Sequence, residues 1–165
     1  MKQHTVIDSP CNPLTLVADD GVLCGLYMTG QRHRPPQETF GEPADLAAFD
    51  AAEEQLQAYF AGELKEFTLE LRLTGTPFQL RVWDRLRRIP YGEVRSYGEL
   101  ADALGAPRAS RAVGLANGRN PVGIIVPCHR VVGASGGLTG YGGGLDRKRR
   151  LLDLEGGTTT LFQCR

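Results

Sequence analysis

The sequence predicts an α+β fold, with a small antiparallel sheet and one helix over residues 1–76 and a mostly helical part over residues 77–165. Short apolar runs between turn residues fill the first part, whereas apolar residues at helical spacing dominate the second. The charge changes sign at the same point, because residues 1–76 hold 5 Lys and Arg against 12 Asp and Glu, and residues 77–165 hold 14 against 7. We therefore expect an acidic domain at 1–76 and a basic domain at 77–165.

Three short strands are expected first, at residues 5–8, 14–18 and 22–28. Asp20-Gly21 separates the last two, and this pair favours a tight hairpin turn. Residues 30–43 are polar and proline-rich, so we expect a surface loop there.

One amphipathic helix and a further strand complete the first domain. Asp50 and Glu53 have the spacing of a capping box, and the apolar stripe that follows ends at Gly62, which predicts a helix. Residues 67–73 alternate apolar and polar side chains, so a strand with one wet face is expected. Nothing in this domain has the pattern of a catalytic site.

The second domain opens with a helix that should run from Pro77, preceded by Thr76 as N-cap, to Pro90. Ser96 and Glu99 form a capping box for a short helix that ends at Gly105.

A further helix is expected over residues 108–117. Two short helices joined by a glycine-containing turn are typical of a helix-turn-helix, whose second helix normally meets DNA. An ordinary helical hairpin gives the same pattern.

Arg111 stands among small residues in the second of these helices. A guanidinium is planar and always charged, which suits it to enter a duplex or to bind phosphate. The excess of arginine in this half points to a polyanionic partner. Two alternatives remain, a surface arginine paired with a nearby acid and two oppositely charged domains that complement each other.

The candidate reactive group is the thiol of Cys128, between Pro127 and His129. It follows residues 122–126, whose branched side chains predict a buried strand. A neighbouring imidazole and the guanidinium of Arg130 are groups that depress a cysteine pKa. The competing interpretation is a core cysteine that packs as a small hydrophobe.

A glycine-rich loop at residues 133–144 and a helix over residues 146–155 follow. Four basic residues stand in the first turns of that helix, where positive charge opposes the helix dipole, so we expect them to serve a partner. They are Arg147, Lys148, Arg149 and Arg150. Residues 156–165 should form a loose tail.

The four cysteines, at positions 11, 24, 128 and 164, predict neither a disulfide framework nor a metal site. They are widely spaced, and His4 and His33 complete no compact ligand pattern with them. The chain also lacks an apolar stretch long enough for a bilayer and a signal peptide. We therefore expect no metal, no membrane association and a soluble cytoplasmic protein.

Ordered motifs across most of the chain make it resemble the O6-alkylguanine-DNA alkyltransferases, also called methylated-DNA–protein-cysteine methyltransferases. The motifs are Phe78-Gln79-x-x-Val82-Trp83, Ile89-Pro90-Tyr91-Gly92-Glu93, Ser96-Tyr97, Arg111-Ala112-Val113-Gly114, Asn120-Pro121, Ile125-Val126-Pro127-Cys128-His129-Arg130-Val131 and Gly140-Tyr141-x-Gly143-Gly144. Ile7-Asp8-Ser9-Pro10 extends the likeness into the first domain.

The resemblance implies direct reversal of DNA damage. The alkyl group of O6-alkylguanine, and of O4-alkylthymine, would pass irreversibly to Cys128, once per molecule and without a cofactor. It also implies a ribonuclease-H-like first domain and a short strand pair beside the helix-turn-helix. The partner would be double-stranded DNA, bound by a monomer through the minor groove with the damaged base flipped out and with clustering along the DNA.

The resemblance also assigns roles to residues. The catalytic group would be Cys128, His129, Glu155, Asn120 and Tyr97, with Glu155 orienting His129 and Tyr97 protonating the leaving base. The DNA-binding residues would be Arg111, Ala112, Gly114, Tyr97, Ser96, Asn117 and Arg130. The substrate pocket would be lined by Tyr141, Gly142, Val131, Pro127 and Gly143.

Two other functions remain open at this point. Cys128, His129 and Glu155 could serve a cysteine hydrolase, although adjacent Cys and His side chains rarely point at each other. A helix-turn-helix protein that only senses damage, without chemistry at Cys128, is the second.

Overall fold

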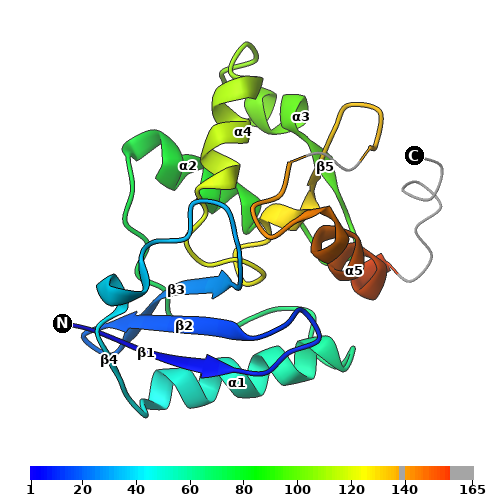
Figure 1. The fold of residues 1–165 in the computed structure, drawn as a ribbon. Coiled ribbons are helices and arrows are strands. Elements are labelled where there is room, and N and C mark those ends of the chain that lie inside the picture. The colour runs from blue at the N-terminus through cyan, green and yellow to red at the C-terminus, as the bar shows by residue number, and fades with distance from the viewer. Residues whose placement is uncertain (138–139, 157–165) are drawn as a thin grey trace.

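The structure, a computed structural model, describes residues 1–137 and 140–156. Figure 1 shows a sheet backed by helix α1 in one half of the molecule and the helices α2 to α5 in the other. This is the expected α+β fold. The tail predicted beyond Gly156, including Cys164, lies outside the described residues.

The N-terminal sheet has the strand order β3-β2-β1-β4. Strands β1 (Lys2–Ile7), β2 (Leu14–Asp19) and β3 (Val22–Met28) pair antiparallel, as predicted. Asp20 and Gly21 both have positive φ, which is the backbone of a type I′ hairpin turn. The sheet is mixed rather than purely antiparallel, because the short β4 (Glu42–Pro43) joins β1 in parallel.

Helix α1 (Ala47–Phe60) begins three residues before the predicted capping box. Its N-cap is Leu46, and the buried Phe49 anchors the first turn against the core, so hydrophobic packing rather than Asp50 sets the start. The short 3₁₀ helix η1 (Gln37–Phe40) interrupts the loop before it and buries Phe40.

The strand predicted at residues 67–73 is wrong. Only Leu71 forms an isolated bridge, to Leu23, within this segment. The backbone of Thr68 bonds instead to the side chain of Gln55 on α1, and Phe67 packs against Tyr59. Side chains of α1 therefore take the place of a neighbouring strand.

Helix α2 (Pro77–Leu86) opens with the predicted cap, since Thr76 and Gln79 form a full capping box. It ends before Pro90, as residues 87–89 continue in turns. Helix α3 (Tyr97–Ala103) has the predicted capping box of Ser96 and Glu99.

Helix α4 (Ser110–Gly118) follows α3 after a turn, so the expected helix-turn-helix pair is present. The buried indole of Trp83 donates to the carbonyl of Ala116 at 2.9 Å, which ties α2 to α4. Strands β5 (Arg95–Ser96) and β6 (Val131–Val132) form the short parallel pair.

The strand predicted at residues 122–126 is also wrong. Val122 makes one bridge to Leu26, and the chain then turns tightly, with Ile124 at φ 69°. Cys128 therefore starts a 3₁₀ helix, η2 (Cys128–Arg130), rather than ending a strand.

Helix α5 (Leu145–Gly156) turns three of its four early basic residues toward the protein. Arg147 donates to the carbonyl of Thr29 at 2.8 Å, Lys148 to that of Val131 at 2.5 Å, and Arg150 to that of Pro10. The buried Lys148 is therefore not available to an outside partner, whereas Arg149 and Arg150 remain exposed.

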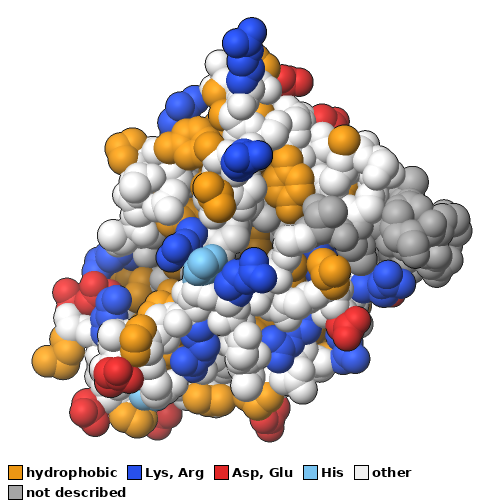
Figure 2. Space-filling view, turned by 45° about the horizontal axis from the view of Figure 1, so that its top comes forward, with side chains coloured by type: hydrophobic (Ala, Val, Ile, Leu, Met, Phe, Trp, Pro, Cys, Tyr) orange, Lys and Arg blue, Asp and Glu red, His pale blue; other side chains and the backbone are white. Residues whose placement is uncertain are grey.

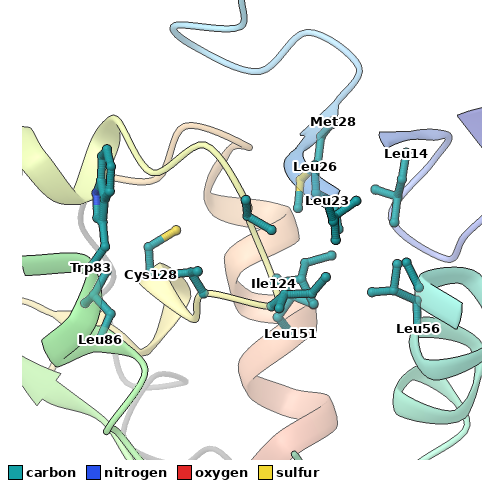
Figure 3. Close-up of a cluster of buried hydrophobic side chains, with 14 of the residues drawn as sticks. Leu14, Leu23, Leu26, Met28, Leu56, Trp83, Leu86, Ile124, Cys128 and Leu151 are labelled. Carbon is teal, nitrogen blue, oxygen red and sulfur yellow. The ribbon is translucent and has the colours of Figure 1, made fainter. Parts of the chain in front are cut away.

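One hydrophobic core runs through both halves. It joins sheet residues such as Leu14 and Leu26 to α2, to Ile124 and to Leu151 on α5, and it includes Cys128 (Figure 3). Within residues 1–137 and 140–156, no helix is both long and apolar enough to span a bilayer.

Candidate active site

A tightly folded turn delivers Cys128. The buried Asn120 accepts from the backbone N–H of Val122 at 3.0 Å and donates to the carbonyl of Val126 at 2.7 Å. These two bonds fix the segment between Asn120 and Val126. The Asn120 amide also lowers the pKa of the Cys128 thiol. Asn120 therefore fixes the turn that carries Cys128.

Ile124 stands at the bend of this turn in the left-handed region, with φ 69°. A β-branched residue rarely adopts that conformation, because its Cβ substituents crowd the backbone. Its side chain is 1% exposed, so packing in the shared core holds it there. The turn that presents the thiol is therefore a strained element held by the rest of the fold.

Cys128 is 6% exposed and packs within the core. Burial raises the pKa of its thiol, while the hydrogen bond from Asn120 and the charge of Lys148 act in the opposite direction. His129 and Arg130, which the sequence suggests as the groups that lower this pKa, are both bonded to Glu155. The resting thiol is therefore protonated and needs a base to become a nucleophile.

His129 is fully buried and lies 2.7 Å from Glu155 through Nε2. An ionised carboxylate only accepts hydrogen bonds, so Nε2 carries the proton and Nδ1 carries the lone pair. Nδ1 has no hydrogen-bond partner among the described residues. Burial lowers the pKa of His129, against the opposing effect of Glu155, so the imidazole rests neutral with an open basic nitrogen.

Glu155 collects donors from three side chains. Arg130 binds it in a bidentate manner, with Nε 2.8 Å from Oε1 and Nη2 3.0 Å from Oε2. Tyr59 and His129 both donate to Oε2. Burial alone would raise the pKa of Glu155, but its bonds and charge interactions with His129 and Arg130 lower the pKa to about 2.

Arg130 does not reach the surface that the DNA-binding assignment requires. It is 6% exposed, and its Nη1 donates to the carbonyl of Ile89 at 2.6 Å. Its place as the counter-ion of Glu155 explains why a charged side chain is buried here.

The thiol faces a small cavity of about 10 Å³. Its walls include Asn117, Tyr141 and Gly142, and also Gln31 from the N-terminal half. That volume holds about one water molecule. A larger cavity of about 360 Å³ lies on the side of Pro127 and Arg130 but does not include Cys128, so we place the candidate site at the smaller one.

Tyr141, Gly142 and Gly143 line the cavity, as the pocket assignment expects, whereas Pro127 lines the larger one. The carbonyl of Gly142 accepts from the backbone N–H of Arg32 at 2.8 Å. Val131 is buried, and its carbonyl accepts from Lys148. The N-terminal half therefore closes one side of the thiol site.

Helix α4 presents Arg111, Ala112 and Leu115 to solvent. Leu115 is 69% exposed and lies one turn after Arg111 on the same face. Gly114 faces the ring of Tyr97, since a Cβ built there would lie 3.7 Å from it. In Figure 2 basic side chains are spread over the whole visible face, including its upper part, and acidic ones stand near the top, at the sides and along the lower margin.

Three other residues assigned to DNA have partners within the protein. The Ser96 hydroxyl caps α3 by accepting from Glu99 N–H. Asn117 is buried and donates to the carbonyl of Cys128 at 3.3 Å, so it lies at the thiol rather than on the outer face. Tyr97 is half-buried and donates to the carbonyl of Gly140 at 3.4 Å, beside the glycine-rich loop.

Three residues near the site are absent from the sequence-based assignment. Lys148 could have been found, because it shares a helical face with Leu151, Leu152 and Glu155 at spacings of three, four and seven. Tyr59 and Gln31 reach the site from the other half of the chain, and no local pattern signals that.

Among the described residues, no group of three or more His, Cys, Asp or Glu side chains is placed to hold a metal ion. The described cysteines, 11, 24 and 128, are all free thiols.

Comparisons with known proteins cover nearly the whole chain. The family model for the 6-O-methylguanine DNA methyltransferase ribonuclease-like domain matches residues 3–73, and that for the DNA binding domain matches residues 77–157. The methylated-DNA–protein-cysteine methyltransferase of Mycobacterium tuberculosis (strain H37Rv) is 61% identical over 94% of this chain and 93% of the relative. The methylated-DNA–protein-cysteine methyltransferase of Methanosarcina acetivorans is 51% identical over 93% of this chain and 97% of the relative.

A solved structure is equally similar. The crystal structure of Mycobacterium tuberculosis OGT in complex with DNA has a TM-score of 0.88 and 59% identity, over 94% of this chain and 93% of that one.

Proposed function

The chain belongs to the 6-O-methylguanine DNA methyltransferase family, and from this premise we propose that it transfers an alkyl group from O6 of guanine in DNA to its own Cys128. The observation that carries the proposal is the buried relay of Cys128, His129 and Glu155, with a protonated thiol beside a neutral imidazole. A group-transfer reaction that begins by deprotonating a thiol needs this arrangement.

The thiol proton passes to Nδ1 of His129 through a water, because neighbouring residues of one 3₁₀ turn do not face each other directly. Glu155 stabilises the imidazolium that forms. The thiolate then attacks the alkyl carbon in line, so a sulfur–carbon bond forms as the carbon–O6 bond breaks. Asn120 holds the turn that carries Cys128 during this step.

The leaving guanine carries the electrons of the broken bond and needs a proton on its ring. Tyr97 is proposed to supply it, since its hydroxyl lies next to the glycine-rich loop that would cover the base. The proton lost by the thiol finally replaces the one that Tyr97 gives up. The thioether is stable, so each molecule acts once and needs no cofactor.

The damaged nucleotide must leave the duplex to reach the buried sulfur. We propose that α4 enters the minor groove, where its small residues permit close approach, and that Arg111 fills the space left by the base. The cavity of about 10 Å³ is too small for a guanine, so residues 141–143 must shift when the base arrives. O4-alkylthymine is proposed as a second substrate.

We further propose two domains, residues 1–76 and 77–165, which the separate matches at 3–73 and 77–157 support. Double-stranded DNA is the proposed partner of a monomer that clusters along it, and the DNA complex of the mycobacterial relative supports the choice of DNA. Free thiols among the described residues fit the expected cytoplasmic location.

Mass spectrometry after incubation with an O6-methylguanine duplex tests the proposal. We expect the protein to gain the mass of one methyl group on Cys128, with no further turnover. Cys128→Ser should lower transfer at least about a thousandfold while DNA binding persists. Repeated cleavage of an ester or peptide would indicate a hydrolase, and repair that survives Cys128→Ser would indicate a protein that only senses damage.

A further inference from the structure

Tyr59 brings a hydroxyl from the N-terminal half into the catalytic relay. It stands on α1, 96 residues before Glu155, and donates to Glu155 Oε2 at 2.5 Å. Its side chain is fully buried. A bond this short to a carboxylate belongs to the stronger, charge-assisted class.

The same carboxylate oxygen accepts from His129. Nε2 of His129 lies 2.7 Å from Oε2, and Nη2 of Arg130 lies 3.0 Å from it, so Oε2 holds three donors. A donor to the carboxylate stabilises its charge, and that charge is what favours the protonated imidazole. Tyr59 therefore weakens the hold that Glu155 has on the His129 proton.

The hydroxyl of Tyr59 is not needed to orient the carboxylate. Arg130 already fixes the plane of Glu155 through both oxygens. The tyrosine ring is held independently, because it packs against Phe67 with 5.3 Å between ring centroids and against Tyr91 with 6.2 Å. The hydroxyl therefore adds a third hydrogen bond to Oε2 of Glu155.

We propose that Tyr59 is a positioning residue of the relay, whose hydroxyl shares Glu155 Oε2 with His129 and so keeps the imidazole neutral until the thiol proton arrives. This inference deepens the proposed function and rests on it. The charged and titratable groups around the relay include Glu155 and Lys148 from α5, Cys128 and Arg130 from η2, Tyr59 and Tyr91 beside them, and Tyr141 from the glycine-rich loop. Of the two tyrosines, Tyr59 is the one whose hydroxyl bonds Glu155.

Tyr59→Phe keeps the ring and removes the hydroxyl. Glu155 then holds the imidazole proton more strongly, so the pKa of His129 rises. Because a protonated imidazole cannot accept the thiol proton, the acid limb of the single-turnover transfer rate should move to higher pH by about 0.5 or more. The matched control is Tyr91→Phe, since the Tyr91 hydroxyl donates to the carbonyl of Leu154 at 3.4 Å instead. Tyr91→Phe should leave the acid limb of the transfer rate at the same pH as in the wild type.

Titration of the ring ¹⁵N resonances of His129 in DNA-free protein measures the same effect without any transfer. The chain has only three histidines, so His4 and His33 serve as internal references. If the wild type transfers no alkyl group, the proposed function fails, and this titration still decides the role of Tyr59.

Replacement of Tyr59 by 3-fluorotyrosine covers the case in which Tyr59→Phe does not fold. Fluorine strengthens the phenol as a donor, so the pKa of His129 should fall rather than rise. An unchanged pKa of His129 in folded Tyr59→Phe, or an equal shift in Tyr91→Phe, would overturn the proposal. A lowered melting temperature with no change in the pH profile would show a packing role alone and would also overturn it.

Discussion

At the scale of single residues, Glu155 explains how a buried charge is tolerated beside the thiol. Its side chain is 1% exposed, yet the bidentate Arg130 and the donors Tyr59 and His129 satisfy both oxygens. A buried ion pair is costly to break, because removing one partner leaves the other charge without compensation. Glu155 therefore stabilises the buried charge of Arg130, in addition to its proposed role of orienting His129.

The pH dependence of the free energy of unfolding should reveal the contribution of the ionised Glu155. The pKa of Glu155 is about 2 in the folded protein and about 4.3 in an unfolded chain, so its contribution is complete above pH 5 and is lost as the pH falls toward 2. Glu155→Gln should cost about 3–5 kcal/mol at pH 7, and this difference should shrink by about 2 kcal/mol at pH 3.

Urea unfolding of both proteins at pH 7, 5, 4 and 3 measures the difference. If the difference in the free energy of unfolding between wild type and Glu155→Gln stays constant down to pH 3, the stabilising role of an ionised Glu155 is contradicted.

Sequence alone predicted the residues of the site that lie in compact motifs. Cys128, His129 and Asn120 fall within ten positions. Cys128 was singled out from the residues themselves, whereas the roles of His129, Asn120 and Glu155 were assigned through the family resemblance. Tyr59 could not be predicted, because its contact with Glu155 depends on how two halves of the chain pack. Arg130 was placed on DNA for a related reason, since nothing in the sequence shows which way an arginine turns.

At the scale of elements, α4 combines an arginine with an exposed leucine on one face. A leucine that is 69% exposed gains by burial against another surface, and the sugar edges of a narrow groove offer apolar contact. We propose that Arg111 and Leu115 on this face have different roles in DNA binding. One would replace the flipped base, and the other would hold the helix in the groove.

Two variants separate these tasks. Leu115→Ala should weaken duplex binding about five- to tenfold, while Arg111→Ala should slow transfer from duplex DNA more than it weakens binding. Reaction with free O6-benzylguanine should be unchanged in both. The control is Leu80→Ala on α2, which also removes an exposed leucine. Equal loss on duplex and free base would refute the proposed roles, and fluorescence anisotropy with single-turnover assays gives both quantities.

The elements that sequence predicted well have local causes. The N-cap at Thr76, the capping box at Ser96 and the Asp20-Gly21 turn each depend on at most four neighbouring residues, and all three are present. The two failed strands, at 67–73 and 122–126, depended on distant partners. Side chains of α1 satisfy the first segment, and the second bends at Ile124 instead of extending.

At the scale of the whole molecule, the N-terminal half supports the site directly. The backbone N–H of Leu26 on β3 donates to the carbonyl of Pro121 at 2.9 Å, which ties the sheet to the turn that carries Cys128. Arg147 joins the glycine-rich loop to the N-terminal half, because it donates to the carbonyls of both Thr29 and Gly143 and to Asn12 Oδ1. The two halves thus hold the thiol between them.

Removing the Arg147 side chain should loosen this connection. Arg147→Ala should lower the free energy of unfolding by about 1–2 kcal/mol and speed amide hydrogen exchange at residues 29–32 and 141–144. Arg149→Ala is the matched control, since Arg149 is an exposed arginine on the same helix. Identical exchange in both variants would show that Arg147 does not join the two loops.

The burial of Cys128 also affects how fast its thiol is oxidised before it meets a substrate. Peroxide attacks thiolates, and it attacks exposed ones fastest. A sulfur that is 6% exposed and protonated at rest therefore reacts slowly with oxidants. For the proposed reaction, in which each molecule transfers one alkyl group, this slow oxidation keeps Cys128 available as a thiol until a damaged base arrives.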